Sequence, residues 1–209
     1  MKRVLLIGLS LVLALVGWST VGAEDGFYVI PAMKGKYAPV PKTGQTASYG
    51  TKDDGALQNG VASPTPRFTD NNNGTVTDNL TKLIWMKNAN IFAPPLGVNV
   101  ESAMWLAANL EDDEAQSWGL KDKSKKGDWR LPNLRELQSL VDYATYAPPL
   151  PAGNPFTGVQ QVYYWTSTTK AGNPNNAWLV HFYAGRLYDY QKSYSTEIGT
   201  AVWCVRGGP

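Results

Sequence analysis

Short β-prone stretches separated by turn residues occupy the last quarter of the sequence, and this pattern limits the fold more than any other feature. Strands are predicted from Val162 to Thr168, Ala177 to Phe182, Arg186 to Tyr190 and Thr200 to Val205, because their β-branched and aromatic side chains favour pleated backbone. The residues Tyr183-Ala184-Gly185 are predicted to join the two middle strands as a hairpin. An antiparallel sheet is therefore expected here.

Two helices are predicted before this β-rich part. Asn99 can cap a helix from about Val100 to Leu110, in which apolar residues recur at the spacing of one helical face. Asn133 and Glu136 have the spacing of a capping box at the start of a second helix, which the prolines from Pro148 onward end. The predicted buried face of this second helix consists of Leu137, Leu140, Val141 and Ala144. Helices followed by antiparallel strands indicate an α+β fold, with the two helices packed on antiparallel sheets.

A further hairpin is predicted where the globular domain begins, at Arg67. β-prone residues flank the turn 71–74, whose Asn and Gly residues tolerate the positive φ of tight turns. The alternative is a calcium loop of the EF-hand type, which places Gly sixth and Glu twelfth after the first Asp. Counted from Asp70, Gly74 is fifth and Thr81 is twelfth, so the turn is favoured. Residues 83–86 are predicted to form a buried strand.

Residues 1–23 have the features of a secretory signal peptide. Lys2 and Arg3 precede an apolar run from Val4 to Val16, and small residues end the segment at Ala23. The alternative is an uncleaved anchor, but the apolar run is short for a membrane-spanning helix. We therefore expect export to a secreted, periplasmic or cell-surface location, with no membrane span after cleavage. Residues 24–66 are interpreted as an extended arm rich in Pro and Gly, and residues 67–209 as the globular domain.

The exported part of the chain carries no formal net charge. The whole sequence has 19 Lys and Arg against 17 Asp and Glu, and Lys2 and Arg3 belong to the predicted signal peptide. Binding of nucleic acid or of a membrane surface through bulk positive charge is therefore not expected. The lysine-rich segment 121–126 is interleaved with acidic residues and is interpreted as a solvated loop.

Cys204 is the single cysteine, so the domain cannot form an internal disulfide and must rest on its hydrophobic core. Its apolar surroundings in the sequence indicate a buried, inert thiol, since a nucleophilic cysteine needs a base and His181 is the single histidine. Asp53, Asp54 and other acidic residues are interpreted as turn residues. No catalytic residues, metal or cofactor are expected, and the protein is predicted not to be an enzyme.

A series of motifs, in sequence order, resembles the Lcl C-terminal domain family. These motifs are Thr43-Gly44-Gln45-Thr46, Asp53-Asp54-Gly55-Ala56-Leu57, Arg67-Phe68-Thr69-Asp70, Gly74-Thr75-Val76-Thr77-Asp78, Leu83-Ile84-Trp85, Trp129-Arg130-Leu131-Pro132-Asn133, Tyr164-Trp165-Thr166-Ser167-Thr168 and Ala177-Trp178. The resemblance implies a C-type-lectin-like fold, shared with formylglycine-generating enzymes. It also implies a relationship to the binding end of a bacterial collagen-like adhesin that recognises sulfated glycosaminoglycans. The enzymes' chemistry requires a pair of active-site cysteines, which Cys204 alone cannot supply.

The end of the β-rich part offers the candidate ligand-binding residues. At period two along one extended strand, side chains lie on one face, which would present rings for stacking and cations for sulfate or carboxylate. The predicted ligand-binding residues are Tyr183, Arg186, Tyr188, Tyr190, Lys192 and Tyr194. The alternative is that these tyrosines cover a half-buried sheet.

The ligand expected from this surface is a carbohydrate, with sulfated polysaccharide as one candidate, in an adhesin-like role. The alternative function is a structural or protein-interaction subunit of a bacterial surface or envelope assembly, in which the arm docks on a neighbour and forms an oligomer. The turn 173–176 could also offer amide oxygens to calcium, but neutral amides bind that ion poorly, so a simple turn is favoured.

Overall fold

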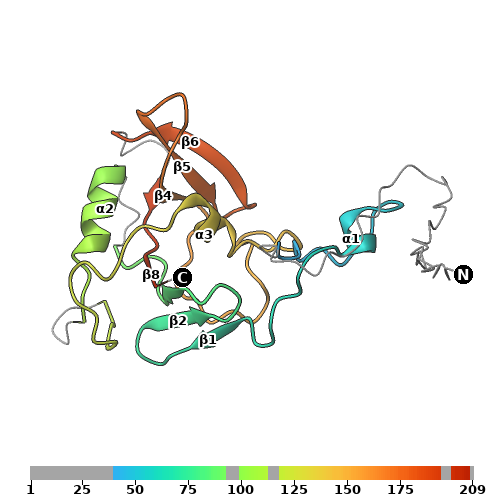
Figure 1. Ribbon diagram of the computed structural model, residues 1–209, viewed down its shortest axis with the longest axis horizontal. Helices are drawn as coiled ribbons and strands as arrows, with labels where there is room; N and C mark the ends of the chain where they lie inside the picture. Colours follow the sequence, from blue (N-terminus) through green and yellow to red (C-terminus); the bar gives the residue numbers. More distant parts are fainter. Residues whose placement is uncertain (1–39, 93–98, 113–117, 194–198, 208–209) are drawn as a thin grey trace, which may run out of the picture. The chain divides into compact units, whose positions relative to one another are not determined.

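The computed structural model describes residues 40–92, 99–112, 118–193 and 199–207. Within these ranges the chain forms two four-stranded sheets with short helices, which confirms the mixed α+β class (Figure 1). The predicted signal peptide, the first part of the predicted arm and Tyr194 lie outside the described residues. In the described part of the chain, no helix has the length and apolar character needed to cross a membrane.

The first sheet has the order β1-β2-β3-β8 and is antiparallel throughout. Its strands are β1 (Phe68–Asp70), β2 (Thr75–Asp78), β3 (Ile84–Met86) and β8 (Val205–Arg206). The hairpin predicted around residues 71–74 is therefore confirmed, and Gly74 has a φ of 85°. Asp70 at the start of this turn pairs with Lys87 at 2.6 Å, so its carboxylate has a structural partner.

The second sheet has the order β6-β5-β4-β7. Its strands are β4 (Tyr163–Thr169), β5 (Asn176–His181), β6 (Arg186–Gln191) and β7 (Thr200–Ala201). The predicted hairpin at residues 183–185 joins β5 and β6. The prediction of a purely antiparallel arrangement is wrong at one edge, because β7 pairs with β4 in parallel.

The single strand predicted from Thr200 to Val205 is also wrong, since this segment divides between the two sheets. Thr200 and Ala201 join the second sheet, whereas Val205 joins the first. The residues between them are buried, and the indole of Trp203 donates a hydrogen bond to the Met86 carbonyl at 2.8 Å. Burying this large side chain between the sheets turns the backbone away from a straight path, so the segment connects both sheets through the core.

Helix α2 (Val100–Ala108) confirms the first predicted helix, including its cap. The Asn99 side chain accepts a hydrogen bond from the Ser102 amide at 2.8 Å, which satisfies one of the unpaired donors at the helix start. Val100, Ala103 and Ala107 form the buried side, and the helix packs against β4. A hydrogen bond of 3.1 Å from the Val100 amide to the Lys192 carbonyl ties the start of α2 to the end of β6.

Helix α3 (Leu134–Gln138) confirms the predicted capping box, but it is shorter than predicted. The Ser139 hydroxyl donates to the Glu136 carbonyl at 2.7 Å, and this side-chain bond competes with continued helix. Leu140 and Val141 are still buried beyond the helix end, whereas Ala144 is exposed, contrary to the predicted face. A third short helix, α1 (Asp54–Leu57), lies within the predicted arm, so the prediction of two helices was incomplete.

One hydrophobic core connects the two sheets. Trp203 contacts Trp85 of β3, with ring centroids 5.9 Å apart, and Tyr164 of β4, with centroids 5.7 Å apart. Phe182, just after β5, packs on the same indole at 5.4 Å. Cys204 is fully buried beside this cluster, as predicted. The core therefore fixes the second sheet, whose strands β4, β5 and β6 carry the candidate binding residues.

Candidate functional site

The predicted ligand-binding residues begin in the β5–β6 hairpin. Tyr183 lies in the turn and has 48% of its surface exposed, and Tyr188 in β6 has 49% exposed. Arg186 is also exposed, whereas Tyr190 is half-buried. Tyr194 lies outside the described residues.

The rings of these tyrosines belong to a continuous series that crosses three strands. Tyr163 stacks on His181 with 4.3 Å between centroids and 22° between planes, and it contacts Tyr188 at 5.6 Å. Tyr188 and Tyr190 follow at 6.3 Å, in a stacked arrangement. At the other end, Tyr183 contacts His181 at 6.1 Å and Tyr146 at 6.4 Å. We call this the aromatic surface and define it by Tyr146, Tyr163, His181, Tyr183, Tyr188 and Tyr190.

The strand register explains why these rings meet. His181 of β5 lies opposite Tyr163 of β4 and opposite Arg186 of β6. Directly opposed residues on neighbouring strands project to the same side of a sheet, so Tyr163, His181 and Arg186 share one face. Tyr188 lies two positions further along β6 and returns to that face. The surface is therefore a product of pairing between strands as well as of the alternation within β6.

The hairpin turn is held close to the segment that follows α3. Gly185 has a φ of 69°, and a side chain at this position would come within 2.5 Å of Val141 and 3.3 Å of Tyr143. The Ala147 amide donates to the Tyr183 carbonyl at 2.8 Å. This contact brings Tyr146, which has 74% of its surface exposed, beside the hairpin.

Two ionisable side chains lie at the aromatic surface: the guanidinium of Arg186, which is charged, and the imidazole of His181, whose neutral form is favoured. Burial lowers the pKa of His181, and the nearby Arg186 guanidinium lowers that pKa further, although a hydrogen bond at Gln161 acts in the opposite direction. In the described part of the chain, the exposed side chain of Arg186 makes no hydrogen bond or ion pair. Within the described residues, the surface therefore offers a row of aromatic rings and the unpaired guanidinium of Arg186.

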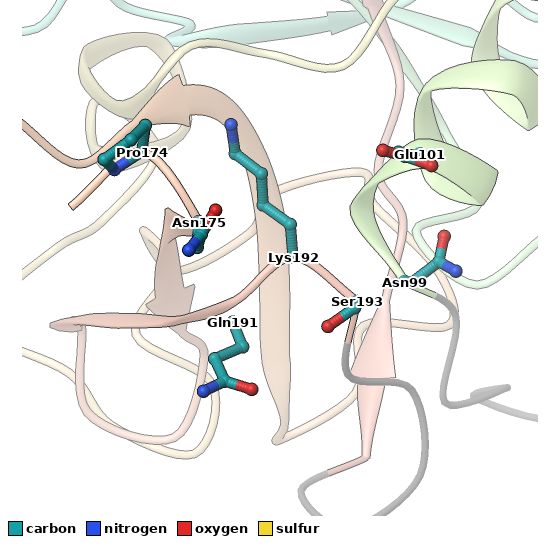
Figure 2. Close-up of a pocket in the computed structure, with 7 residues that line it drawn as sticks. All are labelled: Asn99, Glu101, Pro174, Asn175, Gln191, Lys192 and Ser193. Atoms are coloured by element: carbon teal, nitrogen blue, oxygen red, sulfur yellow. The ribbon is translucent and has the colours of Figure 1, made fainter.

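Lys192 does not continue the strand as predicted. Strand β6 ends at Gln191, and the Lys192 ammonium donates to the Thr169 hydroxyl at 2.8 Å. Lys192 instead lines a separate pocket of about 480 Å³, shown in Figure 2. The pocket residues are Asn99, Glu101, Pro174, Asn175, Gln191, Lys192 and Ser193.

Sequence reasoning missed three members of the aromatic surface, His181 of β5 and the two tyrosines Tyr146 and Tyr163. For the tyrosines the reason is their place in the fold. Alternation within β6 could not reveal them, because one lies two strands away and the other comes from the irregular segment after α3. The signal for Tyr163 was the hairpin itself: once β5 pairs with β4, a tyrosine opposite His181 must share its face. No comparable pattern in the sequence indicated Tyr146.

The acidic residues and the thiol have structural roles. Asp53 caps α1 by accepting from the Ala56 amide at 2.9 Å, and Asp78 is bound by Arg67 at 2.8 Å. Burial raises the pKa of the Cys204 thiol, which keeps it protonated and unreactive. Among the described residues there is no group of three or more His, Cys, Asp or Glu side chains placed to hold a metal ion. The exposed chemistry of the site is stacking, hydrogen bonding and one positive charge.

Comparison with known proteins gives a family assignment. The chain matches no curated protein. A family model matches residues 74–206, from the turn between β1 and β2 to the end of β8. This range includes both sheets almost completely, together with the aromatic surface and the pocket at Lys192. The chain therefore belongs to the Lcl C-terminal domain family.

Proposed function

We propose that the protein is a non-enzymatic binding module that recognises carbohydrate through the aromatic surface, in an adhesin-like role after export from the cell. The observation that carries this proposal is the continuous series of rings from Tyr146 to Tyr190, in which Tyr146, Tyr183 and Tyr188 have 74%, 48% and 49% of their surface exposed. A soluble domain rarely exposes so many neighbouring aromatic rings unless they contact a ligand or partner.

The chemistry of these rings suits saccharides. Tyrosine offers a flat apolar face for the C–H groups of a sugar ring and a hydroxyl that bonds its polar groups. Six rings in series, with neighbouring centroids 4.3 to 6.4 Å apart, give an extended surface that suits several sugar residues rather than one. Arg186 adds a donor that can bind a sulfate or carboxylate in two places at once. A polysaccharide with occasional acidic groups is therefore the proposed ligand class.

A glycan array tests the proposal. The protein purified after export is applied to neutral, carboxylated and sulfated polysaccharides at two salt concentrations. We expect selective binding that Tyr188→Ala weakens at least tenfold, which corresponds to about 1.4 kcal/mol. The matched control is Tyr49→Ala, which removes a ring that is 87% exposed but lies outside the aromatic surface. A folded protein that binds no glycan, or equal effects of the two variants, contradicts the proposal.

A second candidate function is a subunit of an envelope assembly that docks through the arm. The described part of the arm exposes Val40, Tyr49, Leu57 and Val61, with exposed fractions from 42% to 87%. Large apolar side chains gathered in one segment are typical of a protein-protein contact. Light scattering over a range of concentrations tests this function. Assembly that Val40→Ser and Leu57→Ser abolish supports it, and a strict monomer at high concentration contradicts it.

A further inference from the structure

The polar pocket at the end of β6 is built from three segments that are distant in sequence. Figure 2 shows side chains from the start of α2, from the turn before β5 and from the end of β6 around one opening. Two backbone hydrogen bonds hold these segments together, because the Lys192 carbonyl accepts from Val100 and the Lys192 amide donates to Asn175. The backbone of Lys192 therefore joins all three segments around the opening.

Most polar side chains that line the pocket do not pair with one another. In the described part of the chain, Glu101, Asn175 and Gln191 make no side-chain hydrogen bond or ion pair. The Lys192 ammonium uses one donor on Thr169 and has two remaining. The pocket thus holds both donors and acceptors that have no partner among the described residues.

The balance of these groups indicates the class of ligand. The single ammonium of Lys192 and the single carboxylate of Glu101 cancel in formal charge, so the pocket does not select an anion or a cation. Hydroxyl groups donate and accept at once, and they therefore match a lining of mixed amides, one ammonium and one carboxylate. The volume of about 480 Å³ lies within the usual range for small-molecule sites, roughly 300–1,000 Å³.

We propose that this pocket binds one neutral sugar residue through its hydroxyl groups. The proposal rests on the carbohydrate-binding function above and adds a subsite to it. Tyr190 belongs to the aromatic surface and Gln191 to the pocket; as consecutive residues of the edge strand β6 they project to opposite faces of the sheet, so the two sites lie on either side of this edge. A saccharide chain that leaves the rings and passes around this edge of the sheet places its next residue, or its end, in the pocket. The rings supply contact area, and the pocket selects the hydroxyl pattern.

Nuclear magnetic resonance titration with free neutral monosaccharides tests this subsite. Glucose, galactose, mannose and N-acetylglucosamine are added separately at millimolar concentrations, and inorganic sulfate is added as an anionic probe. We expect at least one sugar to shift the side-chain amide signals of Asn175 and Gln191 and the backbone amide of Ser193. Shifts at these positions from sulfate alone, or from none of the sugars, overturn the proposal.

Two pairs of variants identify the groups that bind. Glu101→Gln and Lys192→Gln each remove one charged partner of the sugar, and we expect each to weaken monosaccharide binding about tenfold or more. The matched controls are Glu111→Gln and Lys125→Gln, which remove the same charges from the surface near residues 111–126. Effects of the pocket variants that do not exceed those of the controls overturn the proposal.

The same measurements separate this subsite from the proposed function. If Tyr188→Ala abolishes polysaccharide binding while no sugar shifts the pocket amides, the aromatic surface is correct and the subsite is wrong. If the sugars shift the pocket amide signals, and the Glu101 and Lys192 variants weaken monosaccharide binding, the subsite is correct. If Tyr188→Ala then has no effect on polysaccharide binding, the assignment of the aromatic surface is wrong.

Discussion

The imidazole of His181 stacks on the ring of Tyr163, with 4.3 Å between the two centroids. The same imidazole lies opposite Arg186 in the strand pairing. A positively charged imidazole in this place would lose part of its hydration and would be repelled by the guanidinium. The neutral form is therefore favoured, and the aromatic surface keeps an uncharged centre at neutral pH.

The first prediction concerns the titration of His181, which is the single histidine in the chain. Burial, and then the charge of Arg186, lower the pKa of His181 below its usual value of 6.5. The imidazole signals in a proton NMR titration should give this lowered pKa directly. Arg186→Ala should raise it, because a repelling charge is removed, whereas Arg135→Ala, which removes an exposed arginine elsewhere, should leave it unchanged.

This titration also has a consequence for stability. With a lowered pKa, the folded protein binds fewer protons on His181 than the unfolded chain does, so stability rises with pH in that interval. The free energy of unfolding should fall as the pH drops below about 6.5 toward the folded pKa of His181. His181→Gln cannot titrate and should flatten this part of the pH profile in urea denaturation. An unchanged slope in this variant would show that other groups cause the dependence.

The second prediction concerns the ion pair between Arg67 and Asp78. The Asp78 side chain is fully buried, and the guanidinium binds its two carboxylate oxygens at 2.8 and 2.9 Å. Removing one partner leaves an uncompensated charge in the interior. Arg67→Ala should therefore lower the free energy of unfolding by about 3–5 kcal/mol in urea denaturation. The exposed Arg135→Ala should change it by less than about 0.5 kcal/mol, and equal losses would contradict the structural role of the pair.

The pair also predicts how stability responds to acid. Burial alone raises the pKa of Asp78, but the hydrogen bonds and charge of Arg67 outweigh burial and hold that pKa below 3.8. The stabilisation from this carboxylate is therefore complete above about pH 4 and is lost as the pH falls through the lowered value. In Arg67→Ala this dependence should disappear or reverse, because an unpaired buried carboxyl favours its neutral form.

The third prediction separates backbone strain from steric collision at the β5–β6 turn. Gly185 and Gly172 both have a positive φ, at 69° and 79°. A side chain at Gly185 meets Val141 at 2.5 Å, whereas nothing lies within 4 Å of one at Gly172. Gly172→Ala should cost about 1–2 kcal/mol from strain alone. Gly185→Ala should cost more and should also weaken glycan binding, because it displaces Tyr183.

Thermal melting and the glycan array measure these two effects separately. If Gly185→Ala destabilises the protein no more than Gly172→Ala does, the turn does not pack tightly on the segment after α3. Tyr183 would then be positioned by the strand pairing alone.

The fourth prediction concerns Cys204. Its side chain is fully buried, and burial raises the pKa of the thiol. A thiol-specific reagent should therefore not react with the folded protein at neutral pH and should react with one equivalent after denaturation. Rapid reaction of the native protein would contradict the burial of this segment. Cys204→Ser should lower stability without changing glycan binding, since it places a hydroxyl in the core.

Local patterns in the sequence predicted the parts of the fold that depend on neighbouring residues. Asn99 and the pair Asn133 and Glu136 begin helices as expected, because capping needs a side chain and a backbone amide within one turn. The hairpins around Gly74 and Gly185 formed for the same reason. Arg186 and Tyr188, which the alternation along β6 predicted to share one face, are both exposed, but Leu187 between them is exposed as well and Tyr190 is half-buried.

The parts that depend on distant residues were decided by the tertiary structure. The predicted strand ending at Val205 divides between two sheets because Trp203 is buried between them. The lysine-rich segment was interpreted as solvated, yet the Asp122 side chain is fully buried and lies 2.9 Å from the Arg206 guanidinium. A local charge pattern cannot show which acidic residue finds a partner on another segment.

Some of the candidate binding residues likewise depend on neighbouring residues, and others depend on distant ones. The sequence by itself determined the family motifs, the α+β class and the tyrosines of β6, because each of these depends on residues that are close together in the chain. Only the tertiary structure placed Tyr163 and Tyr146 beside them and moved Lys192 into a pocket with Glu101. Strand register and the contact of β6 with α2 are set by packing across the whole core, and no local spacing encodes them.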